Sequence, residues 1–550
     1  MAWAGSVGGA SAAAQQAQSS SRTRGGMVRT LTRPCPISTP HARCLWMRHG
    51  TRVPRHRLQL MDQSSLRTPL PTVDPSLPLR ARKRTKILAT LGPACDDPTT
   101  VRAMLEAGVN AVRLNMSHGS RDDQLRRLKT VRSLSKEMDR PVAVLADLQG
   151  PKIRTGRMKN NEPVELIPGK TLIITTDVCL EGTAERVGTT YTGLSKDLKP
   201  GDTVLIDDGK MRLRTEAIDG HEITLRIEVG GLLKNSKGIN LPGANVSAPA
   251  LSDKDREDLT WAIENGVDFI ALSFVRTARD VRHVKSRIAE AGRNVPVIAK
   301  IERPDAVSNI DGILAESDGI MVARGDLGIE ISIERLPIVQ KELILRANRL
   351  GKLVITATQM LESMIDGEMP SRAEATDIAN AVFDGTGVVM LSGETATGKH
   401  PVQAVAAMSS ILLEAEKSRY LPTFEPDPEA QTFSREIMSL SGAAHRISVE
   451  TAGEAILISS NSPEPALLLS KRRGRVPMVC ICTDERLWHA FCLYWGIAAV
   501  LVEPATDLQA LLESGIDSAI AHGFIRDGQQ AVVLTHFDDR QVAGIKLQKI

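Results

Sequence analysis

The sequence predicts an α/β protein built on a closed (β/α)8 barrel (TIM barrel), with a small inserted β-barrel lid domain and a C-terminal α/β domain. Short apolar, β-branched runs alternate with helical segments on both sides of one interruption. Three such runs precede the interruption and five follow it, which gives the eight strands of a closed barrel. The interruption, from about Pro151 to Ala250, loses the helical pattern and shows short alternating runs separated by Pro-Gly, Asp-Gly and Gly-Gly turns.

Length and composition are those of a globular protein with several domains. The chain has 550 residues, of which 42% are hydrophobic and 24% charged, and no apolar run reaches membrane-spanning length. Its seven cysteines, scattered from Cys35 to Cys492, are an odd number in a long chain, so we expect a reducing compartment rather than a disulfide framework. Cys480 and Cys482 lie one residue apart in an apolar run, which favours buried small residues over a metal site.

Residues 1–82 are expected to form a disordered N-terminal extension. Residues 1–61 contain nine arginines and no Asp or Glu, so the rest of the chain carries about −5 (the total of +4 minus 9). The body of the protein is therefore not basic, and we expect neither a nucleic-acid nor a membrane partner.

The role of this Arg-rich segment has three interpretations. An Arg- and Ser-rich segment without acidic residues is typical of an organellar transit peptide. The interpretation that we favour is a bacterial reading frame that begins at an upstream start, with Met27, Met47 or Met61 as the true first residue of a cytoplasmic protein. An RNA-binding arm has no aromatic or glycine-repeat support.

The barrel is expected to comprise residues 83–150 and 245–420. Its first part should hold strands and helices in alternation with short connections, which implies a parallel sheet. These elements are the strands Thr85–Thr90, Ala111–Asn115 and Val142–Asp147 and the helices Thr99–Ala107 and Arg121–Met138. The second part should hold strands near Phe269–Ser273, Val297–Lys300, Gly319–Ala323, Leu353–Ala357 and Val388–Leu391, each followed by a helix.

The insert, residues 151–244, is predicted to act as a lid. Its clearest strands are Thr171–Thr175, Thr203–Ile206 and Glu222–Ile227. Because it follows the third strand, it should lie over the carboxyl ends of the strands, where barrel enzymes have their active sites.

The C-terminal domain, residues 421–550, follows a Pro-rich spacer, Pro422–Pro428. Its strands are expected near Ala455–Ser459, Met478–Cys482, Ala498–Val502 and Gln530–Thr535. No charged strand ends converge there, so we expect a role in regulation or assembly.

Two neighbouring barrel strands end abruptly in charge, at Val297–Glu302 and Gly319–Asp326. Strand alternation puts Lys300 and Glu302 on one side, and Asp326 is expected to follow a flexible Arg324-Gly325 turn. Two carboxylates and an ammonium at one point suit Mg²⁺ or Mn²⁺, with substrate phosphate and water as the other ligands. The alternative is an exposed ion pair of no functional importance.

Other strand ends at the same mouth carry polar residues. Arg113 and Arg154 are suited to phosphate or carboxylate oxygens. Asn115, Ser117 and Asp147 offer oxygens for a monovalent cation, whereas His118 alone is more often a loop residue without a role. Together these residues predict a divalent metal, an anionic phosphorylated substrate and a mobile cap.

Seven runs, in this order along the chain, resemble pyruvate kinase. They begin at Arg113 (RLNMSHG), Gln149 (QGPKIRTG), Asn240 (NLPGA), Ala299 (AKIE), Met321 (MVARGDLG), Ala357 (ATQMLESM) and Met390 (MLSGETA). The resemblance is dense from Thr85 to Tyr420 and looser beyond. It implies transfer of the phosphoryl group of phosphoenolpyruvate to ADP, giving pyruvate and ATP in the last step of glycolysis.

The resemblance also implies residue roles. Glu302 and Asp326 would ligate Mg²⁺ (or Mn²⁺), and Lys300 would stabilise charge on the phosphoryl group and the enolate. Thr358 would take part in protonating the enolate at its methylene carbon. The residues implied to bind phosphoenolpyruvate are Arg113, Lys300, Thr358 and the amides of Gly325 and Asp326. Those implied to face the nucleotide are Asn115, Met116, Ser117, His118, Arg154 and, from the insert, Lys237.

One departure within the family concerns K⁺. Many pyruvate kinases hold K⁺ with residues that match Asn115, Ser117, Asp147 and the Leu148 carbonyl, and these carry a Glu where this chain has Lys152. The run Asp147–Lys152 resembles the K⁺-independent branch, in which an ammonium supplies the charge that K⁺ would bring. We therefore expect that K⁺ is not required.

Two other classes of function remain open from the residues. A metal-dependent lyase or aldolase acting on pyruvate-like acids would use a similar carboxylate pair without a nucleotide lid. A non-catalytic assembly protein would keep the barrel for binding alone, but the intact Lys300, Glu302, Asp326 and Thr358 argue against it. The family resemblance implies a homotetramer.

Overall fold

The computed structural model describes residues 79, 83–178, 181–244, 246, 247, 249–427, 433–537 and 542–550. The Arg-rich segment 1–61 and Cys35 lie outside these residues, as does all but residue 79 of the expected N-terminal extension. The structure therefore bears on the barrel, the insert and the C-terminal region only.

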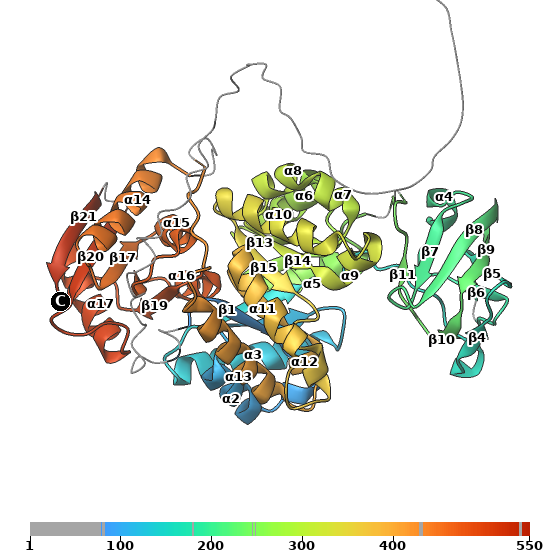
Figure 1. Cartoon of the computed structure of the whole chain (residues 1–550), viewed down its shortest axis with the longest axis horizontal. Helices are drawn as coiled ribbons and strands as arrows, with labels where there is room; N and C mark the ends of the chain where they lie inside the picture. The colour runs from blue at the N-terminus through green and yellow to red at the C-terminus, as the bar shows by residue number, and fades with distance from the viewer. Residues whose placement is uncertain are drawn as a thin grey trace, which may run out of the picture. The chain divides into compact units, whose positions relative to one another are not determined.

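Eight parallel strands close into a barrel in the order β1-β16-β15-β14-β13-β12-β3-β2, which confirms the predicted (β/α)8 architecture. Helices surround these strands (Figure 1). Most of these strand residues are apolar and buried on both faces, as expected for a parallel sheet covered by helices. The strands are β1 (Lys86–Thr90), β2 (Ala111–Asn115), β3 (Ala143–Asp147), β12 (Phe269–Leu272), β13 (Val297–Ile301), β14 (Gly319–Ala323), β15 (Leu353–Ala357) and β16 (Val388–Leu391).

Helices follow the barrel strands and pack around them. Several begin at a serine whose hydroxyl accepts a hydrogen bond from the third helical amide, as Ser120, Ser252 and Ser371 do. The helices are α2 (Pro98–Ala107), α3 (Arg121–Glu137), α5 (Asp253–Glu264), α6 (Ala278–Glu290), α7 (Pro304–Ser308), α8 (Ile310–Glu316), α9 (Arg324–Glu330), α10 (Leu336–Arg349), α11 (Arg372–Asp384), α12 (Gly393–Ala396) and α13 (Pro401–Glu416).

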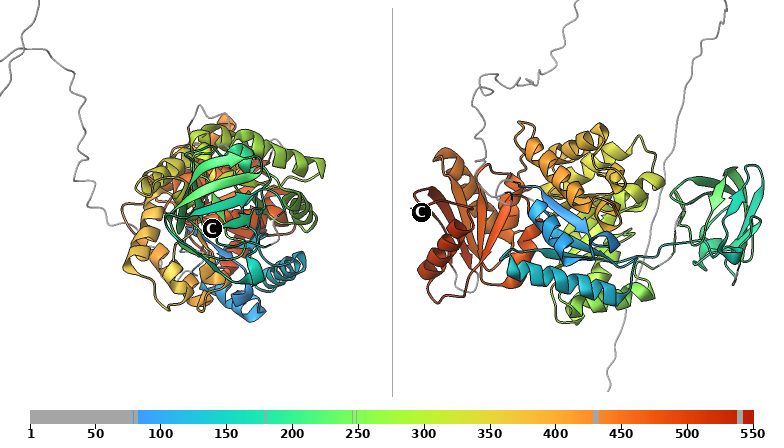
Figure 2. Two further views of the ribbon diagram at one scale, coloured as in Figure 1. Left: turned by 90° about the vertical axis from the view of Figure 1, so that its right-hand side faces the viewer. Right: turned by 90° about the horizontal axis from the view of Figure 1, so that it is seen from below.

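The chain between β3 and α5 forms two sheets, and among its described strands neither sheet closes into a barrel. Figure 2 shows it as strands without the long helices that surround the barrel. One sheet has the order β11-β7-β8-β9-β5-β6 and the other pairs β10 with β4. The strands are β4 (Val164–Leu166), β5 (Thr171–Thr175), β6 (Arg186–Gly188), β7 (Thr203–Ile206), β8 (Met211–Asp219), β9 (Glu222–Val229), β10 (Gly231–Leu233) and β11 (Ile239–Asn240); a short helix, α4 (Leu194–Asp197), precedes β7.

The C-terminal region is a five-stranded sheet with the order β19-β18-β17-β20-β21. Its last strand is antiparallel and was not predicted from the sequence. The strands are β17 (Ala455–Ser460), β18 (Met478–Cys482), β19 (Ile497–Leu501), β20 (Gln530–Phe537) and β21 (Val542–Lys549), and the helices are α14 (Arg435–Glu450), α15 (Glu464–Arg472), α16 (Glu485–Ala490) and α17 (Leu508–Ala521). Cys480 and Cys482 are buried free thiols on β18, as predicted.

The barrel interior shares one apolar cluster with the C-terminal region. Leu88, Leu145 and Met321, which are fully buried, belong to the same cluster as Phe491 and Trp495. The indole Nε1 of Trp495 also donates to Thr85 Oγ1 just before β1, at 3.2 Å. The floor of the barrel is thus closed by C-terminal side chains, which leaves the opposite rim for chemistry.

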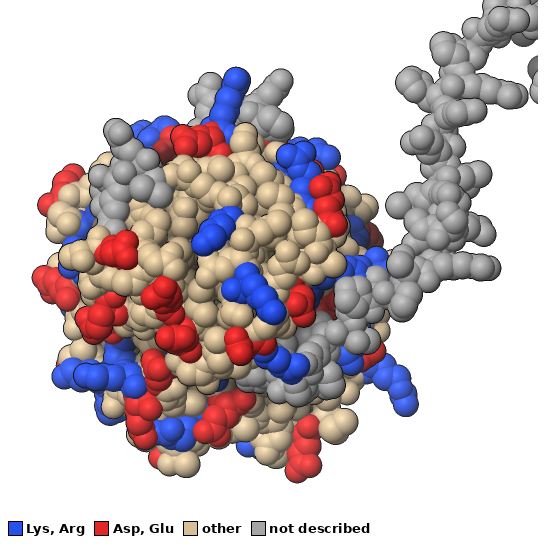
Figure 3. Space-filling model, turned by 90° about the vertical axis from the view of Figure 1, so that its left-hand side faces the viewer, with Lys and Arg blue, Asp and Glu red and all other residues tan. Residues whose placement is uncertain are grey.

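Two observations bear on whether the protein binds a membrane or a nucleic acid. Within the described residues, no helix combines the length and the apolar character needed to cross a bilayer. On the face seen in Figure 3, acidic and basic side chains are interspersed with uncharged surface, and neither sign gathers into a large patch.

Candidate active site

Lys300 lies at the centre of the charged residues at the carboxyl ends of the barrel strands. Its Nζ is 3.0 Å from Glu302 Oε1 and 3.2 Å from Asp147 Oδ1, and it donates to Ser273 Oγ at 2.7 Å. These oxygens come from the ends of three adjacent strands, β13, β3 and β12. The strand alternation that places Lys300 beside Glu302 was read correctly from the sequence.

The Lys300 side chain is only 11% exposed, and Asp147 and Glu302 are 1% exposed. Burial lowers the pKa of the ammonium, but the charges of Asp147 and Glu302 outweigh burial and raise it above its usual value. Lys300 is therefore a buried, charged residue paired with two carboxylates, and not the exposed ion pair that was the alternative interpretation of the sequence.

Glu302 and Asp326 are the two carboxylates expected to hold a divalent ion. Glu302 Oε2 accepts a hydrogen bond from the Phe274 amide at 2.6 Å. Burial raises the pKa of Glu302, Lys300 lowers it, and the nearby charge of Asp326 raises it further, so the net shift is upward. Two carboxylates that repel each other, one buried and one half-buried, fit a divalent cation, whose charge would relieve the repulsion.

This donor set also fits the coordination habits of Mg²⁺. In the described part of the chain, no group of three or more His, Cys, Asp or Glu side chains could hold a metal ion. Mg²⁺ commonly takes only one or two protein carboxylates and completes its shell with phosphate oxygens and water. A pair such as Glu302 and Asp326 is sufficient for such a site.

The approach to Asp326 differs from the prediction. Arg324 and Gly325 are the first residues of α9 and not a flexible turn, because the helix starts directly after β14. Arg324 is buried; its Nη1 pairs with Asp377 at 2.7 Å and its Nη2 donates to the Thr358 carbonyl at 2.7 Å. These contacts fix the first turn of α9, which carries Asp326.

Asp147 was predicted to offer oxygen to a monovalent cation, but both its oxygens already face cationic side chains. Arg113 Nε lies 2.6 Å from Asp147 Oδ2, and Lys300 approaches Oδ1. Burial raises the pKa of this carboxyl, yet Lys300 and Arg113 together hold it below its usual value. Arg113 is fixed further by a hydrogen bond from Nη1 to Thr90 Oγ1 at 3.1 Å.

Thr358 and Gly325 lie against each other at the ends of β15 and β14. The Gly325 amide donates to Thr358 Oγ1 at 2.7 Å, and the hydroxyl donates to the Ala357 carbonyl at 2.6 Å. Thr358 and Gln359 have φ angles of 70° and 54°, a conformation that costs free energy for residues other than glycine. Phe274, whose amide contacts Glu302, has a φ of 53° as well.

The residues after β2 form a tight turn. Asn115 Oδ1 accepts from the Ser117 amide at 3.1 Å, and the His118 amide donates to the Asn115 carbonyl at 3.2 Å. The Met116 side chain is buried in the barrel core, so only its backbone can face a ligand. The Leu148 carbonyl, expected at the monovalent-cation site, accepts from Ser273 Oγ at 2.7 Å.

His118 lies near three basic residues. Burial lowers the pKa of its imidazole, and the charges of Arg154, Arg113 and Lys152 lower it further. Arg154 donates to the Ser236 carbonyl at 3.1 Å, and Lys237 pairs with Asp207 at 2.7 Å. These two residues come from the insert, whereas His118 and Arg113 come from the end of β2.

Sequence reasoning missed Ser273, Phe274 and Arg324 as members of this site. Ser273 carried a weak signal, because it is a small polar residue at the end of a predicted strand. Phe274 acts through its backbone amide, which leaves no signal in the sequence. Arg324 was assigned to a turn. Its position directly after a buried strand, like the position of Lys300 near the end of β13, was the signal that could have identified it.

A closed (β/α)8 barrel whose mouth gathers carboxylates, a lysine and an arginine defines a metal-dependent enzyme that acts on anionic substrates. The family models "Pyruvate kinase, barrel domain" and "Pyruvate kinase, alpha/beta domain" match residues 82–405 and 438–544. The chain belongs to the pyruvate kinase family.

Named relatives agree with this assignment. The chain is 39% identical to a pyruvate kinase of Geobacillus stearothermophilus over 85% of its length and 80% of the relative. It is 41% identical to that of Corynebacterium glutamicum over 82% of its length and 94% of the relative. A crystal structure of a pyruvate kinase from Cryptosporidium parvum aligns with a TM-score of 0.78 and 32% identity, over 85% of this chain and 97% of that one.

The protein is accordingly a phosphotransferase (EC 2.7.1.40) that transfers the phosphoryl group of phosphoenolpyruvate to ADP, giving pyruvate and ATP in glycolysis. As a member of this family it requires a divalent metal ion.

Replacing Lys300 by Met should reduce both turnover and stability. Turnover should fall about a thousandfold, because a preorganised charge is lost. The free energy of unfolding should fall by about 3 kcal/mol, because the buried Glu302 loses its cationic partner and the buried Asp147 keeps only Arg113. Coupled-assay kinetics and urea unfolding of the purified variant measure the two effects.

The matched control is Lys285→Met, which removes a half-exposed ion pair with Asp318. That change should cost less than about 1 kcal/mol and leave turnover normal. Near-normal turnover of Lys300→Met would exclude Lys300 from the chemistry.

Proposed function

We propose that the cluster around Lys300 holds phosphoenolpyruvate and stabilises its phosphoryl group during transfer to ADP. The observation that carries the proposal is that the Lys300 ammonium lies within 3.2 Å of oxygens from three strand ends. A buried ammonium held in this way is preorganised to stabilise negative charge, and phosphoryl transfer depends mainly on positioning and charge stabilisation. The same charge would stabilise the enolate that remains when the phosphoryl group has left.

Glu302 and Asp326 would bind the divalent ion, which we propose to be Mg²⁺, with Mn²⁺ able to replace it. When bound, the ion would withdraw charge from the phosphoryl and carboxylate oxygens of the substrate. The hydrogen bond from the Phe274 amide orients Glu302, and Asp326, in the first turn of α9, lies close enough for its charge to raise the pKa of Glu302.

Arg113, Thr358 and the first amides of α9 would bind phosphoenolpyruvate. Asp147 and Thr90 hold the Arg113 guanidinium, which leaves it oriented for a phosphate. The Gly325 amide and the Thr358 hydroxyl are hydrogen-bonded to each other, so both lie at one position beside Asp326. We assign to the Thr358 hydroxyl a part in protonating the enolate at its methylene carbon.

ADP would be bound by the turn after β2 and by the insert. Asn115, Ser117, His118 and the backbone of Met116 would face the nucleotide from the barrel. Arg154 and Lys237 would contribute positive charge from the insert, acting as a lid. Support comes from the effect of Arg154 on His118, because that electrostatic contact links the insert to the end of β2.

Pyruvate formation from phosphoenolpyruvate should depend strictly on ADP and on Mg²⁺. Glu302→Gln and Asp326→Asn should each raise the Mg²⁺ concentration needed for half-maximal rate at least about tenfold, because a carboxylate ligand is lost. Glu316→Gln, a carboxylate that pairs with Arg282 on the barrel surface, serves as the control and should match the parent protein. Pyruvate release without ADP would instead favour a lyase.

We also propose that this enzyme belongs to the K⁺-independent branch. Lys152 lies close enough to the mouth for its charge to lower the pKa of His118, which supports a role as a built-in cation. Turnover should therefore stay within about twofold when Na⁺ or tetramethylammonium replaces K⁺.

The reverse experiment uses Lys152→Glu. This variant should become strongly activated by K⁺, because it loses the ammonium and gains a carboxylate. A large activation of the parent enzyme by K⁺ in the same coupled assay would refute the proposal.

A homotetramer is the proposed assembly. Ile333, Ile338 and Leu345 are 72%, 59% and 39% exposed, and the latter two lie seven residues apart on one face of α10. Light scattering should give the mass of an oligomer for the parent protein and a smaller mass for Ile338→Asp. A monomeric parent protein would contradict the proposal.

We propose that the enzyme acts in the cytoplasm. The four described free cysteines are all buried thiols, which fits a reducing compartment. The organellar alternative depends on residues 1–61, outside the described part of the chain, and N-terminal sequencing of the mature protein distinguishes the two.

A further inference from the structure

Three adjacent strand ends each contribute two residues with different contacts. One residue of each pair belongs to the proposed catalytic cluster. The other contacts the chain where the insert returns to the barrel, residues 239–244, 246 and 247, here called the return segment. The pairs are Ser273 and Arg276 after β12, Glu302 and Arg303 at the end of β13, and Asp326 and Glu330 in α9 after β14.

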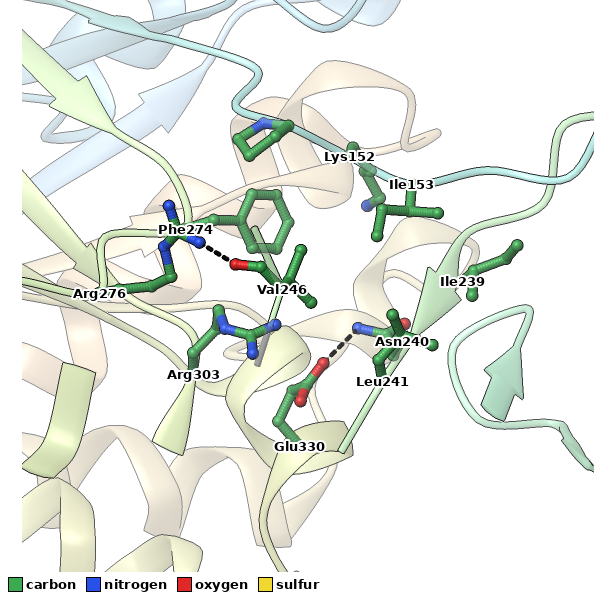
Figure 4. Close-up of a pocket in the computed structure, with 11 residues that line it drawn as sticks. Lys152, Ile153, Ile239, Asn240, Leu241, Val246, Phe274, Arg276, Arg303 and Glu330 are labelled. Atoms are coloured by element: carbon green, nitrogen blue, oxygen red, sulfur yellow. Dashed lines mark hydrogen bonds between the residues drawn. The ribbon is translucent and has the colours of Figure 1, made fainter. Parts of the chain in front are cut away.

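The second residue of each pair forms a hydrogen bond with the return segment. Figure 4 shows two of these bonds, those of Arg276 and Glu330. Arg276 donates to the Val246 carbonyl. Arg303 Nη2 donates to the Ala244 carbonyl at 3.0 Å.

Glu330 makes the contact nearest to the insert sheet. Its Oε1 accepts from Asn240 Nδ2 at 3.3 Å, and the Leu241 amide lies close enough to lower the pKa of the Glu330 carboxyl. Asn240 belongs to β11, the edge strand of the six-stranded sheet of the insert, so this contact reaches the insert itself.

Arg303 and Glu330 are buried charged residues that lie outside the proposed catalytic cluster. They are 7% and 8% exposed. Burial raises the pKa of Glu330, and the charge of Arg303 offsets part of this increase. Arg303 Nε and Glu330 Oε2 have no hydrogen-bond partner within the described residues and border a pocket between β11, Phe274 and α9. Burying a charged side chain costs free energy. The burial of Arg303 and Glu330 therefore has to be offset by a favourable interaction or to serve a function.

The return segment is directly connected to the basic residues assigned to ADP. Arg154 forms an isolated β-bridge with Gly238, and the Thr155 amide donates to the Lys237 carbonyl at 2.8 Å. The Ile239 amide donates to the Ile153 carbonyl at 2.9 Å. A force that holds Asn240 in place therefore also holds Arg154 and Lys237.

We propose that Arg276, Arg303 and Glu330 form a clasp that positions the insert for ADP binding. They act as positioning residues. Each forms a hydrogen bond with the return segment, and each follows a strand whose end also contributes a residue to the catalytic cluster. The catalytic cluster and the lid are thereby positioned by the same three strand ends. This inference rests on the proposed roles of Arg154 and Lys237 toward ADP.

The decisive experiment compares ADP binding with metal binding in variants of one contact. Glu330→Ala and Asn240→Ala remove it from opposite sides, and each should raise the KM for ADP about tenfold. The KM for phosphoenolpyruvate, and Mn²⁺ binding measured by electron paramagnetic resonance without nucleotide, should stay within about twofold. Hydrogen exchange of the amides in residues 239–244 should become faster in both variants.

Two further variants serve as controls. Glu330→Gln keeps an acceptor for Asn240 and should recover most of the ADP affinity. Arg282→Ala, which breaks a surface ion pair between α6 and Glu316, should match the parent protein in every measurement.

The clasp is refuted if Glu330→Ala and Asn240→Ala leave the KM for ADP and the exchange rates unchanged. It is refuted equally if ADP, phosphoenolpyruvate and Mn²⁺ binding weaken together with a fall in the thermal midpoint, because that pattern marks a purely structural role. Lys237→Ala, measured in parallel, separates the two proposals. A normal KM for ADP in Lys237→Ala would overturn the nucleotide assignment, whereas the exchange rates would still decide whether the clasp exists.

Discussion

The buried ion network around Lys300 is the constraint on which the mouth of the barrel depends. Two cations, Lys300 and Arg113, face three carboxylates, Asp147, Glu302 and Asp326, which leaves one negative charge in excess (+2 − 3 = −1). Unpaired charge is costly in a site this dry, so the excess favours a divalent cation and then an anionic substrate. The affinity for the divalent cation and for the anionic substrate thus follows from the excess of one negative charge among side chains that the strands hold in fixed positions.

Backbone strain is concentrated at the same rim. Phe274, Thr358 and Gln359 all adopt positive φ angles immediately after barrel strands. Such conformations persist where surrounding contacts fix them. Here Glu302 fixes Phe274 through its amide, while Arg324 holds the carbonyl of Thr358. The charged network therefore fixes the chain direction at several strand ends as well as the side chains that it pairs.

Much of the fold could be predicted from the sequence, because buried parallel strands are continuous apolar runs whose ends are marked by charge. The eight barrel strands and the interruption after the third were predicted on this basis, and the strand from Val297 places Lys300 and Glu302 together as expected. The antiparallel strand β21 was missed, because its lysines and its glycine break the apolar alternation on which such predictions depend.

The errors at the site have a common physical cause, which is that tertiary contacts override local signals. Gly325 suggested a flexible turn, but the pairing of Arg324 with Asp377 starts a helix there. Asp147 was named from the sequence as an oxygen donor for a monovalent cation, and in the structure it pairs with the side chains of Arg113 and Lys300. The enclosure of Lys300 by three strand ends has no local signal in the sequence and follows from the fold alone.

The shared apolar cluster below the barrel has a consequence for how the protein comes apart. Leu88, Leu145 and Met321 pack in one continuous core with Phe491 and Trp495, although the two sets lie in regions matched by separate family models. Separating the C-terminal region from the barrel would expose the apolar residues of the barrel floor to water. The two regions should therefore unfold together in one cooperative transition. Substitutions on the surface of the C-terminal region should be tolerated independently of the barrel. Substitutions of the C-terminal side chains that pack against the barrel floor should require compensating changes in the barrel.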